Sequence, residues 1–433
     1  MIKAITHATL YDFHTYRENA YILFDKEILE IGSMSDFTNK GYDIIDGKDH
    51  LILPGLVCGH THIYSAFARG LSLPFNPQNF QEILDQLWWK LDGKLDLDMI
   101  YHSGIVFAID FLKNGVTTVI DHHASGIDIK GSLKTLSKAV SKDIGLRGIY
   151  AFETSDRFDV NACIKENMSF AKSNQSSFIR GLFGLHASSS LSDKTLKLVK
   201  KNLNDMPIHI HVAESKEDEE DSLLKYKKTI IQRLVDHGIL NPKSIIAHAI
   251  HITDDELDLI KKHQAVIAVN MSSNMNNGVG TPNLHRFMNK HIPVIIGNDG
   301  ISQAMTTEYL MAYYAMHHQD QSPNPFQLSH LLKMICDTYD YASQILEIKL
   351  GKIEKDYQAD LLMVPYIPPT PLNKGHIFGH LFFGLFHSFK PKHVFIEGKQ
   401  KIKNYQVSKK MEESYRSAQV SSKRLWNNLS KEV

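Results

Sequence analysis

Two short apolar runs of this sequence carry pairs of histidines separated by a single residue. One pair is His60 and His62, and the other is His209 and His211. Side chains two residues apart in a β-strand point to the same face, so the first pair can share one ion. In the second pair His211 lies nearer the carboxyl end of its run and is the better ligand, whereas His209 is expected to be a buried, hydrogen-bonded core histidine. Because imidazole is a common ligand of divalent ions, the pairs predict a metal site.

Carboxylates and another histidine end the neighbouring runs. Glu214 lies three residues after His211, His248 closes a further run, and Asp299 belongs to an Asn-Asp-Gly segment after the last one. Each signal is weak alone. Together they place imidazoles and carboxylates at the carboxyl ends of four predicted strands, which is where barrel enzymes build their active sites.

Eight such runs, rich in β-branched residues, alternate with longer helical stretches between Pro54 and Gly300. This alternation predicts parallel βαβ units, and eight of them favour an α/β fold closed into a (β/α)8 TIM barrel. An open doubly wound sheet is the alternative, but the sequence has no phosphate-binding glycine fingerprint to support it. The runs are 55–60, 116–121, 145–151, 180–186, 207–212, 244–249, 265–270 and 293–299.

The two chain ends have a different pattern from the middle. Residues 1–52 contain short strand and hairpin signals, and strand-like runs return within 351–403. We therefore predict a small composite β-sandwich domain formed by residues 1–52 and 351–433, attached to a catalytic barrel of residues 53–350. An amphipathic helix is expected to close the chain. Its apolar positions are Met411, Tyr415, Ala418, Leu425 and Leu429.

The composition excludes several classes of function. Lys plus Arg and Asp plus Glu each number 48, so no net basic field exists to attract nucleic acid or anionic lipid. The amino terminus lacks an export signal, and the most apolar stretch is far too short to span a membrane. Three cysteines in so long a chain do not form a disulfide framework. We expect a cytoplasmic protein that acts on a small molecule, with no nucleic-acid or membrane partner.

Aromatic and charged residues near the strand ends are candidates for a pocket wall. Trp88, its neighbour Trp89, and Tyr64 could flank a flat ring, although a Trp-Trp-Leu run in a helix is more often part of a core. Arg157 and Glu153 follow the third run, where they either anchor a polar substituent or form a solvated loop.

The motifs of this chain resemble those of the amidohydrolase superfamily, in its cytosine-deaminase and chlorohydrolase-like branch. Within that branch the sequence looks most like the aminohydrolases of the SsnA type. The likeness to the branch rests on 54–62 (PGLVCGHTH), Arg69-Gly70, 211–214 (HVAE), 247–251 (AHAIH), 273–274 (Ser-Asn), 298–300 (Asn-Asp-Gly) and 359–364 (ADLLMV). The closer likeness rests on 87–92 (LWWKLD), 121–125 (DHHAS), 152–157 (FETSDR) and 273–277 (SNMNN).

The resemblance implies a set of metal ligands. They are His60, His62, His211 and Asp299, and they hold one divalent ion, with zinc preferred and iron or manganese as alternatives. Three imidazoles and a carboxylate leave an open position for a water of lowered pKa. The likeness also suggests a homodimer.

Further roles follow from the same resemblance. Glu214 would transfer a proton, and His248 would act, with the carboxylate ligand, on the water and the substrate. Members with two ions bridge them with a group such as a lysine from the fourth strand, but here that strand ends at His186. A single ion is therefore favoured, with His186 as a substrate contact. Asn274 is a further candidate for substrate binding.

These observations predict a metal-dependent hydrolase of carbon–nitrogen bonds. The leading hypothesis is hydrolytic deamination of a nitrogen heterocycle or an amidine. Ring opening of a cyclic amide on the same site is the second hypothesis, and a metal-binding barrel without turnover is the third. Intact Glu214 and His248 count against the third, because a protein that only holds a metal needs neither.

Overall fold

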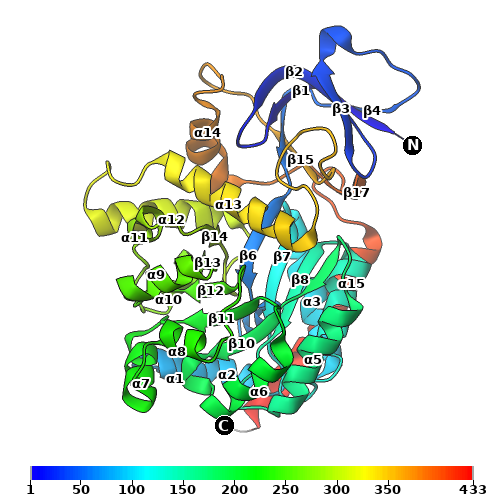
Figure 1. Cartoon of the computed structure of the whole chain (residues 1–433). Coiled ribbons are helices and arrows are strands. Elements are labelled where there is room, and N and C mark those ends of the chain that lie inside the picture. Colours follow the sequence, from blue (N-terminus) through cyan, green and yellow to red (C-terminus); the bar gives the residue numbers. More distant parts are fainter. Residues whose placement is uncertain (1, 432–433) are drawn as a thin grey trace.

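The barrel is the larger part of the computed structural model, which describes residues 2–431 (Figure 1). Its strands form two parallel sheets, β6-β7-β8-β9 and β10-β11-β12-β13-β14. Bridges between Thr154 and Leu185 and between Thr61 and Asp299 join the two sheets and close the ring. The predicted (β/α)8 fold is confirmed. The strands are β6 (Leu56–Thr61), β7 (Val116–His123), β8 (Arg147–Phe152), β9 (Ile179–Gly181), β10 (Phe183–Ala187), β11 (Ile208–Val212), β12 (Ile245–His248), β13 (Val266–Val269) and β14 (Val294–Ile296).

The fourth predicted strand is divided in two. β9 pairs with β8, and β10 pairs with β11, with Leu182 between them. The division lies where the chain passes very close to the end of β8. A Cβ atom added to Gly184 would come within 2.2 Å of the Phe152 carbonyl oxygen, so only glycine allows this approach.

A second sheet combines the two chain ends, as predicted. Its order is β17-β16-β15-β5-β1-β2-β3, with β4 paired to β1. The amino-terminal and carboxyl-terminal segments meet where β5 and β15 run antiparallel. The boundaries at 52/53 and 350/351 stay a prediction. The strands are β1 (Lys3–Tyr11), β2 (Tyr16–Phe24), β3 (Ile28–Ser33), β4 (Asp43–Asp46), β5 (His50–Pro54), β15 (Leu361–Pro365), β16 (His393–Ile396) and β17 (Lys399–Ile402).

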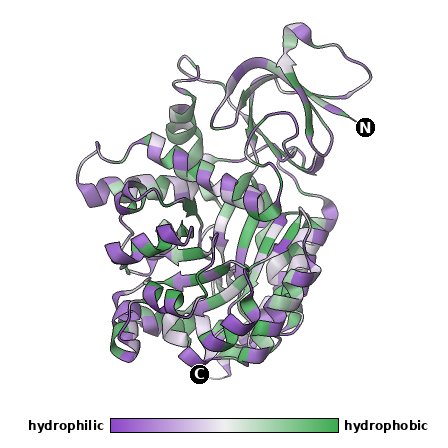
Figure 2. Cartoon of the chain, viewed as in Figure 1, coloured by the Kyte–Doolittle hydropathy of each residue, from purple (hydrophilic) through white to green (hydrophobic). Residues whose placement is uncertain are grey.

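Amphipathic helices surround the barrel. Hydrophobic residues gather along the strands, and hydrophilic residues lie on the outer faces of the helices (Figure 2). Local signals fix where helices begin: Thr253 and Glu256 form a reciprocal capping box at the start of α9. The helices are α3 (Leu97–Lys113), α4 (Ser132–Ser137), α5 (Val160–Ser173), α6 (Asp193–Leu203), α7 (Lys216–Tyr226), α8 (Ile230–Asp236), α9 (Asp254–Lys262), α10 (Met271–Asn276), α11 (Leu284–Asn289), α12 (Met305–Asp320) and α13 (Leu328–Leu346). Across residues 2–431, no helix has the length and apolarity needed to cross a membrane.

The closing helix α15 (Lys409–Ser430) lies against α3 of the barrel, although the sequence grouped it with the second sheet. The Ser421 hydroxyl donates to Asp98 at 2.6 Å, and the Trp426 indole N–H donates to the Phe67 carbonyl at 2.7 Å. Leu425 is fully buried in the same contact. The helix therefore supports the segment that leads out of β6 and away from the predicted metal site.

Candidate active site

Four side chains from three strand ends meet at one point inside the barrel. His62 Nε2 lies 3.0 Å from His211 Nε2 and 3.0 Å from Asp299 Oδ1. His60 Nε2 lies 3.5 Å from the same carboxylate oxygen. One ligand atom from each of the four residues falls within 4.8 Å of all the others. The tertiary structure thus brings together all four side chains that the sequence named as metal ligands.

The other ring nitrogen of each imidazole is held by the surrounding strands. His62 Nδ1 donates to the carbonyl of His122 at 2.6 Å, and His211 Nδ1 donates to the carbonyl of His186 at 2.8 Å. His60 Nδ1 shares a hydrogen bond of 2.7 Å with the buried His209. These bonds turn the three Nε2 atoms toward the common point, as the partners of metal-bound histidines generally do. His209 is the buried, hydrogen-bonded histidine that its place in the strand predicted.

The carboxylate of Asp299 is held just beyond the end of β14. Its backbone has a φ of 58°, a left-handed conformation that Asp tolerates better than most residues. The Ser273 hydroxyl donates to Oδ2 at 2.5 Å and leaves Oδ1 facing the imidazoles. Burial opposes ionisation, but the neighbouring His60 and His62 hold the pKa of Asp299 well below its usual range.

This donor set fits a divalent metal ion. The Nε2 atom of His60 is buried without a hydrogen-bond partner, and burial lowers the pKa of His60 to about 3, so its lone pair is free. Zinc–nitrogen bonds of about 2.0–2.1 Å in a tetrahedral site place neighbouring donor atoms about 3.3 Å apart. The three measured separations, 3.0, 3.0 and 3.5 Å, bracket that value.

A second carboxylate and a fourth imidazole flank the cluster. Glu214 Oε2 lies 3.4 Å from His248 Nε2, and both residues lie within reach of Asp299. The Asn277 amide donates to Glu214 Oε1 at 3.3 Å. Burial, and next the charge of Asp299, raise the pKa of Glu214 well above its usual range. Burial lowers the pKa of His248 to about 4. A protonated carboxyl beside a neutral imidazole is suited to proton transfer.

Asn274 has a different place from the one the sequence suggested. Its side chain is fully buried and donates to His248 Nδ1 at 2.8 Å, and it does not line the cavity. The backbone of His248 has a φ of 72°, so the ring needs an anchor to hold its direction. Asn274 therefore orients His248 instead of contacting a substrate.

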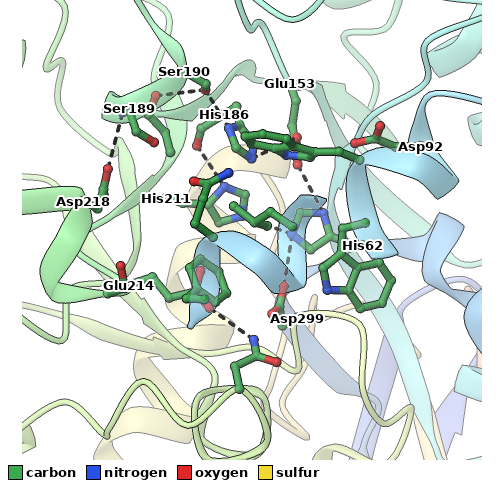
Figure 3. A pocket seen from close by; sticks show the side chains of 18 of the residues that line it. His62, Asp92, Glu153, His186, Ser189, Ser190, His211, Glu214, Asp218 and Asp299 are labelled. Atoms are coloured by element: carbon green, nitrogen blue, oxygen red, sulfur yellow. Dashed lines mark hydrogen bonds and ion pairs between the residues drawn. The ribbon is translucent and has the colours of Figure 1, made fainter. Parts of the chain in front are cut away.

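A cavity of about 610 Å³ opens over the cluster (Figure 3). Trp88, Trp89, Tyr64 and His186 contribute to its wall, together with His62 and the two carboxylates described above. The tryptophans come from a covering segment made of α1 (Phe80–Ile83), the π-helical residues Leu84–Trp88 and α2 (Trp89–Asp92). Both tryptophans and His186 thus line the cavity, and their contact with a substrate stays a prediction.

The charged cluster after β8 is not a solvated loop, because Arg157 and Glu153 both line the cavity; a substrate contact from Arg157 stays a prediction. Arg157 makes a two-pronged ion pair with Asp92, with Nη2–Oδ2 at 2.7 Å and Nη1–Oδ1 at 3.2 Å. Its guanidinium also lies over the ring of Trp89, 4.7 Å from the centroid. Arg157 therefore fastens the covering segment to the barrel, and its charge is already paired. Glu153, in contrast, is buried and faces the cavity.

The structure also assigns partners that the motifs did not indicate. Ser273 and Asn277 hold the two carboxylates, and their only signal in the sequence was membership of the 273–277 segment. His122 is fully buried, stacks on His209 with ring centroids 4.3 Å apart, and supports His62 through its carbonyl.

Residues 51–401 match the amidohydrolase family. The chain belongs to this family. The resemblance seen in the motifs is therefore confirmed, and with it the expected class of enzyme, a hydrolase of carbon–nitrogen bonds. This amidohydrolase is similar to a 5-methylthioadenosine/S-adenosylhomocysteine deaminase of Thermococcus sibiricus, with 26% identity over 369 residues that cover 83% of this chain and 84% of the relative.

Two solved structures share the fold over almost the whole chain. An adenosine deaminase from Xanthomonas campestris with bound zinc has a TM-score of 0.82 at 18% identity, covering 97% of this chain and 98% of that one. An atrazine chlorohydrolase from Arthrobacter aurescens in complex with zinc has a TM-score of 0.80 at 20% identity, covering 98% and 99%. These likenesses show that the chain has the fold of both proteins.

Proposed function

We propose that this amidohydrolase is a metal-dependent deaminase of an aminated nitrogen heterocycle. The observation that carries the proposal is the pair of Glu214 and His248, 3.4 Å apart, beside the cluster of three histidines and an aspartate. Glu214 lines a cavity with aromatic walls of a size for a small molecule, and His248 lies buried beside Glu214. A barrel that only stored a metal would need neither of them.

The metal site consists of His60, His62, His211 and Asp299, which hold a single divalent ion. Zinc is the preferred ion, because it suits mixed imidazole and carboxylate ligands, and the similar Xanthomonas deaminase contains it. Iron and manganese are the alternatives. When bound, the ion supplies the Lewis-acid chemistry that makes water a nucleophile at neutral pH.

The side chains around the ion divide the remaining work. Glu214, whose raised pKa keeps it protonated, delivers a proton to a ring nitrogen or to the leaving amine. His248 accepts a hydrogen bond from Asn274 at Nδ1, so its proton lies on Nε2, directed at Glu214 and the reacting centre. Trp88 and His186 contact the flat ring of the substrate.

Finer assignments rest on the motifs alone. The segments 87–92 and 152–157 favour the SsnA type within the branch, and we propose that assignment. The homodimer and the cytoplasmic location stay predictions.

The test is an ammonia-release assay on the purified, zinc-loaded protein. The panel contains 5-methylthioadenosine and S-adenosylhomocysteine, which the similar deaminase is named for, with other purines, pyrimidines, triazines and cyclic ureides. We expect ammonia in equal amount to a product in which an oxygen function replaces the amino group. Glu214→Gln is the matched control, and it should release ammonia roughly 10²–10⁴-fold more slowly. A product heavier by one water, without ammonia, would instead establish ring opening.

The metal content is measured on the same preparation. Elemental analysis should find one ion per chain. Two ions per chain at full occupancy would contradict the single-ion site.

A further inference from the structure

Glu153 is a buried carboxylate that the proposed chemistry does not use. Glu153 directly follows β8, is 2% exposed and lines the cavity. In the view of Figure 3 it lies on the opposite side of the cavity from Glu214 and Asp299. A substrate held over the metal cluster would therefore meet Glu153 with the edge that points away from the proton donor.

One oxygen of this carboxylate already has neighbours. Glu153 Oε1 lies 3.3 Å from His122 Nδ1 and 3.4 Å from His62 Nδ1. The His62 nitrogen is committed, because its proton goes to the His122 carbonyl at 2.6 Å. His122 Nδ1 is the remaining polar atom beside Oε1, but it is a buried nitrogen without a hydrogen-bond partner.

The other oxygen has no donor among residues 2–431. The polar atom facing Glu153 Oε2 is His186 Nε2, at 3.9 Å, which is beyond hydrogen-bond distance. The Ser190 hydroxyl donates to the Ala187 carbonyl at 3.2 Å, so it accepts the proton of His186 Nδ1 at 2.6 Å. With its proton on Nδ1, a neutral imidazole has only a lone pair at Nε2. His186 Nε2 therefore has no proton to donate to Glu153.

Oε2 is open to the cavity, so a ligand there that supplies an N–H group makes a charge-assisted hydrogen bond to it. We propose that Glu153 is a specificity-determining residue that accepts N–H donors from the substrate and selects rings with an amidine or cyclic guanidine edge. The proposal rests on the proposed function, since it concerns the substrate of that same site. A planar edge with two N–H donors matches a carboxylate in both geometry and charge.

The charges around the cavity support a donor-rich ligand. Both cations in the lining are already paired: Arg157 with Asp92, and Lys225 with Asp221 at 2.8 Å. The field in the cavity is therefore negative, and it attracts an amidine or guanidine edge.

The experiment compares two probes that differ only in that edge, 2-aminobenzimidazole and benzimidazole. Their binding to the zinc-loaded Glu214→Gln protein is measured by calorimetry, so that turnover does not intervene. We expect the amino compound to bind at least about tenfold more tightly, the worth of one charge-assisted hydrogen bond. Adding Glu153→Gln should reduce the ratio to about twofold or less. Adding Glu217→Gln, which changes another carboxylate of the cavity lining, should leave the ratio unchanged.

A role limited to holding His62 predicts a different outcome. In that case Glu153→Gln would lose zinc or weaken both probes equally. Zinc content and thermal melting are measured for each variant. Glu153→Asp is measured in parallel, because its shorter side chain keeps the charge but moves the carboxylate away from the cavity. An unchanged ratio in whichever variant keeps its zinc overturns the proposal, as does loss of zinc from both. Because binding is read without turnover, failure of the ammonia assay and failure of this inference are separate results.

Discussion

The change of Asp360 to Asn tests a buried ion pair that joins the barrel to the second sheet. Arg147, the first residue of β8, is fully buried, and Asp360 is 3% exposed. Their atoms meet at 2.8 Å (Nε–Oδ2) and 3.2 Å (Nη2–Oδ1). Asp360 also accepts the backbone N–H of Glu397 at 2.8 Å. One carboxylate therefore connects a barrel strand to two segments of the sheet.

The expected loss follows from the charge that remains. Removing one partner of a buried pair costs about 3–5 kcal/mol, because the other charge is left uncompensated. Asparagine keeps the shape and one acceptor oxygen, Gln358 still accepts from Arg147 at 2.8 Å, and the Glu397 carboxylate stays 3.6 Å from the guanidinium. We therefore expect the lower end, a fall of about 3 kcal/mol in the free energy of unfolding.

The assay is equilibrium unfolding in urea, followed by circular dichroism and by tryptophan fluorescence. The control is Glu347→Gln, which removes an ion pair of 2.7 Å with Arg180 whose carboxylate is 72% exposed, and which should cost about 0–1 kcal/mol. The double variant Arg147→Met, Asp360→Leu should lose less than Asp360→Asn, because it removes both charges. A loss for Asp360→Asn no larger than that of the control would refute the reasoning.

Two further variants test the proton donor and a buried acid away from the site. Glu214→Gln should keep zinc and lose roughly 10²–10⁴-fold in turnover, the usual worth of general acid–base catalysis, and His248→Asn should behave similarly; turnover near wild type would remove Glu214 from the mechanism. Burial, and next the charge of Glu256, raise the pKa of Glu219 from 4.5 to about 8, so stability falls as pH rises between these values. From pH 6 to pH 9, the free energy of unfolding of Glu219→Gln should fall by about 2 kcal/mol less than that of the wild type. The control is Glu220→Gln, at an exposed neighbour, and its stability should follow the wild type in thermal melts. The same pH dependence of stability in both variants would contradict the raised pKa of Glu219.

The barrel and the place of its histidines at the strand ends were readable from the sequence because their signals are local. Alternation of strand and helix over short stretches predicts parallel units, and the period of two along a strand places His60 and His62 on one face. Parallel strands bring their carboxyl ends to the same rim, which places His211 and Asp299 near this pair, and the resemblance to the amidohydrolase superfamily implied that all four are ligands. The division of the fourth strand was not readable, because it depends on how closely Gly184 approaches the end of β8.

Partner choice was decided only by the tertiary structure. The sequence left Arg157 open between an anchor for the substrate and a solvated loop, and the packing of the covering segment brings Asp92 to it from 65 residues away. Asn274 looked like a substrate contact, yet the packing of α10 turns it toward His248. The same two alternatives were open for Glu153, and only the closed barrel buries it against the cavity, with Oε2 3.9 Å from His186. Sequence spacing fixes which rim a side chain reaches, whereas its hydrogen-bond partner depends on which distant segments packing brings within about 3 Å.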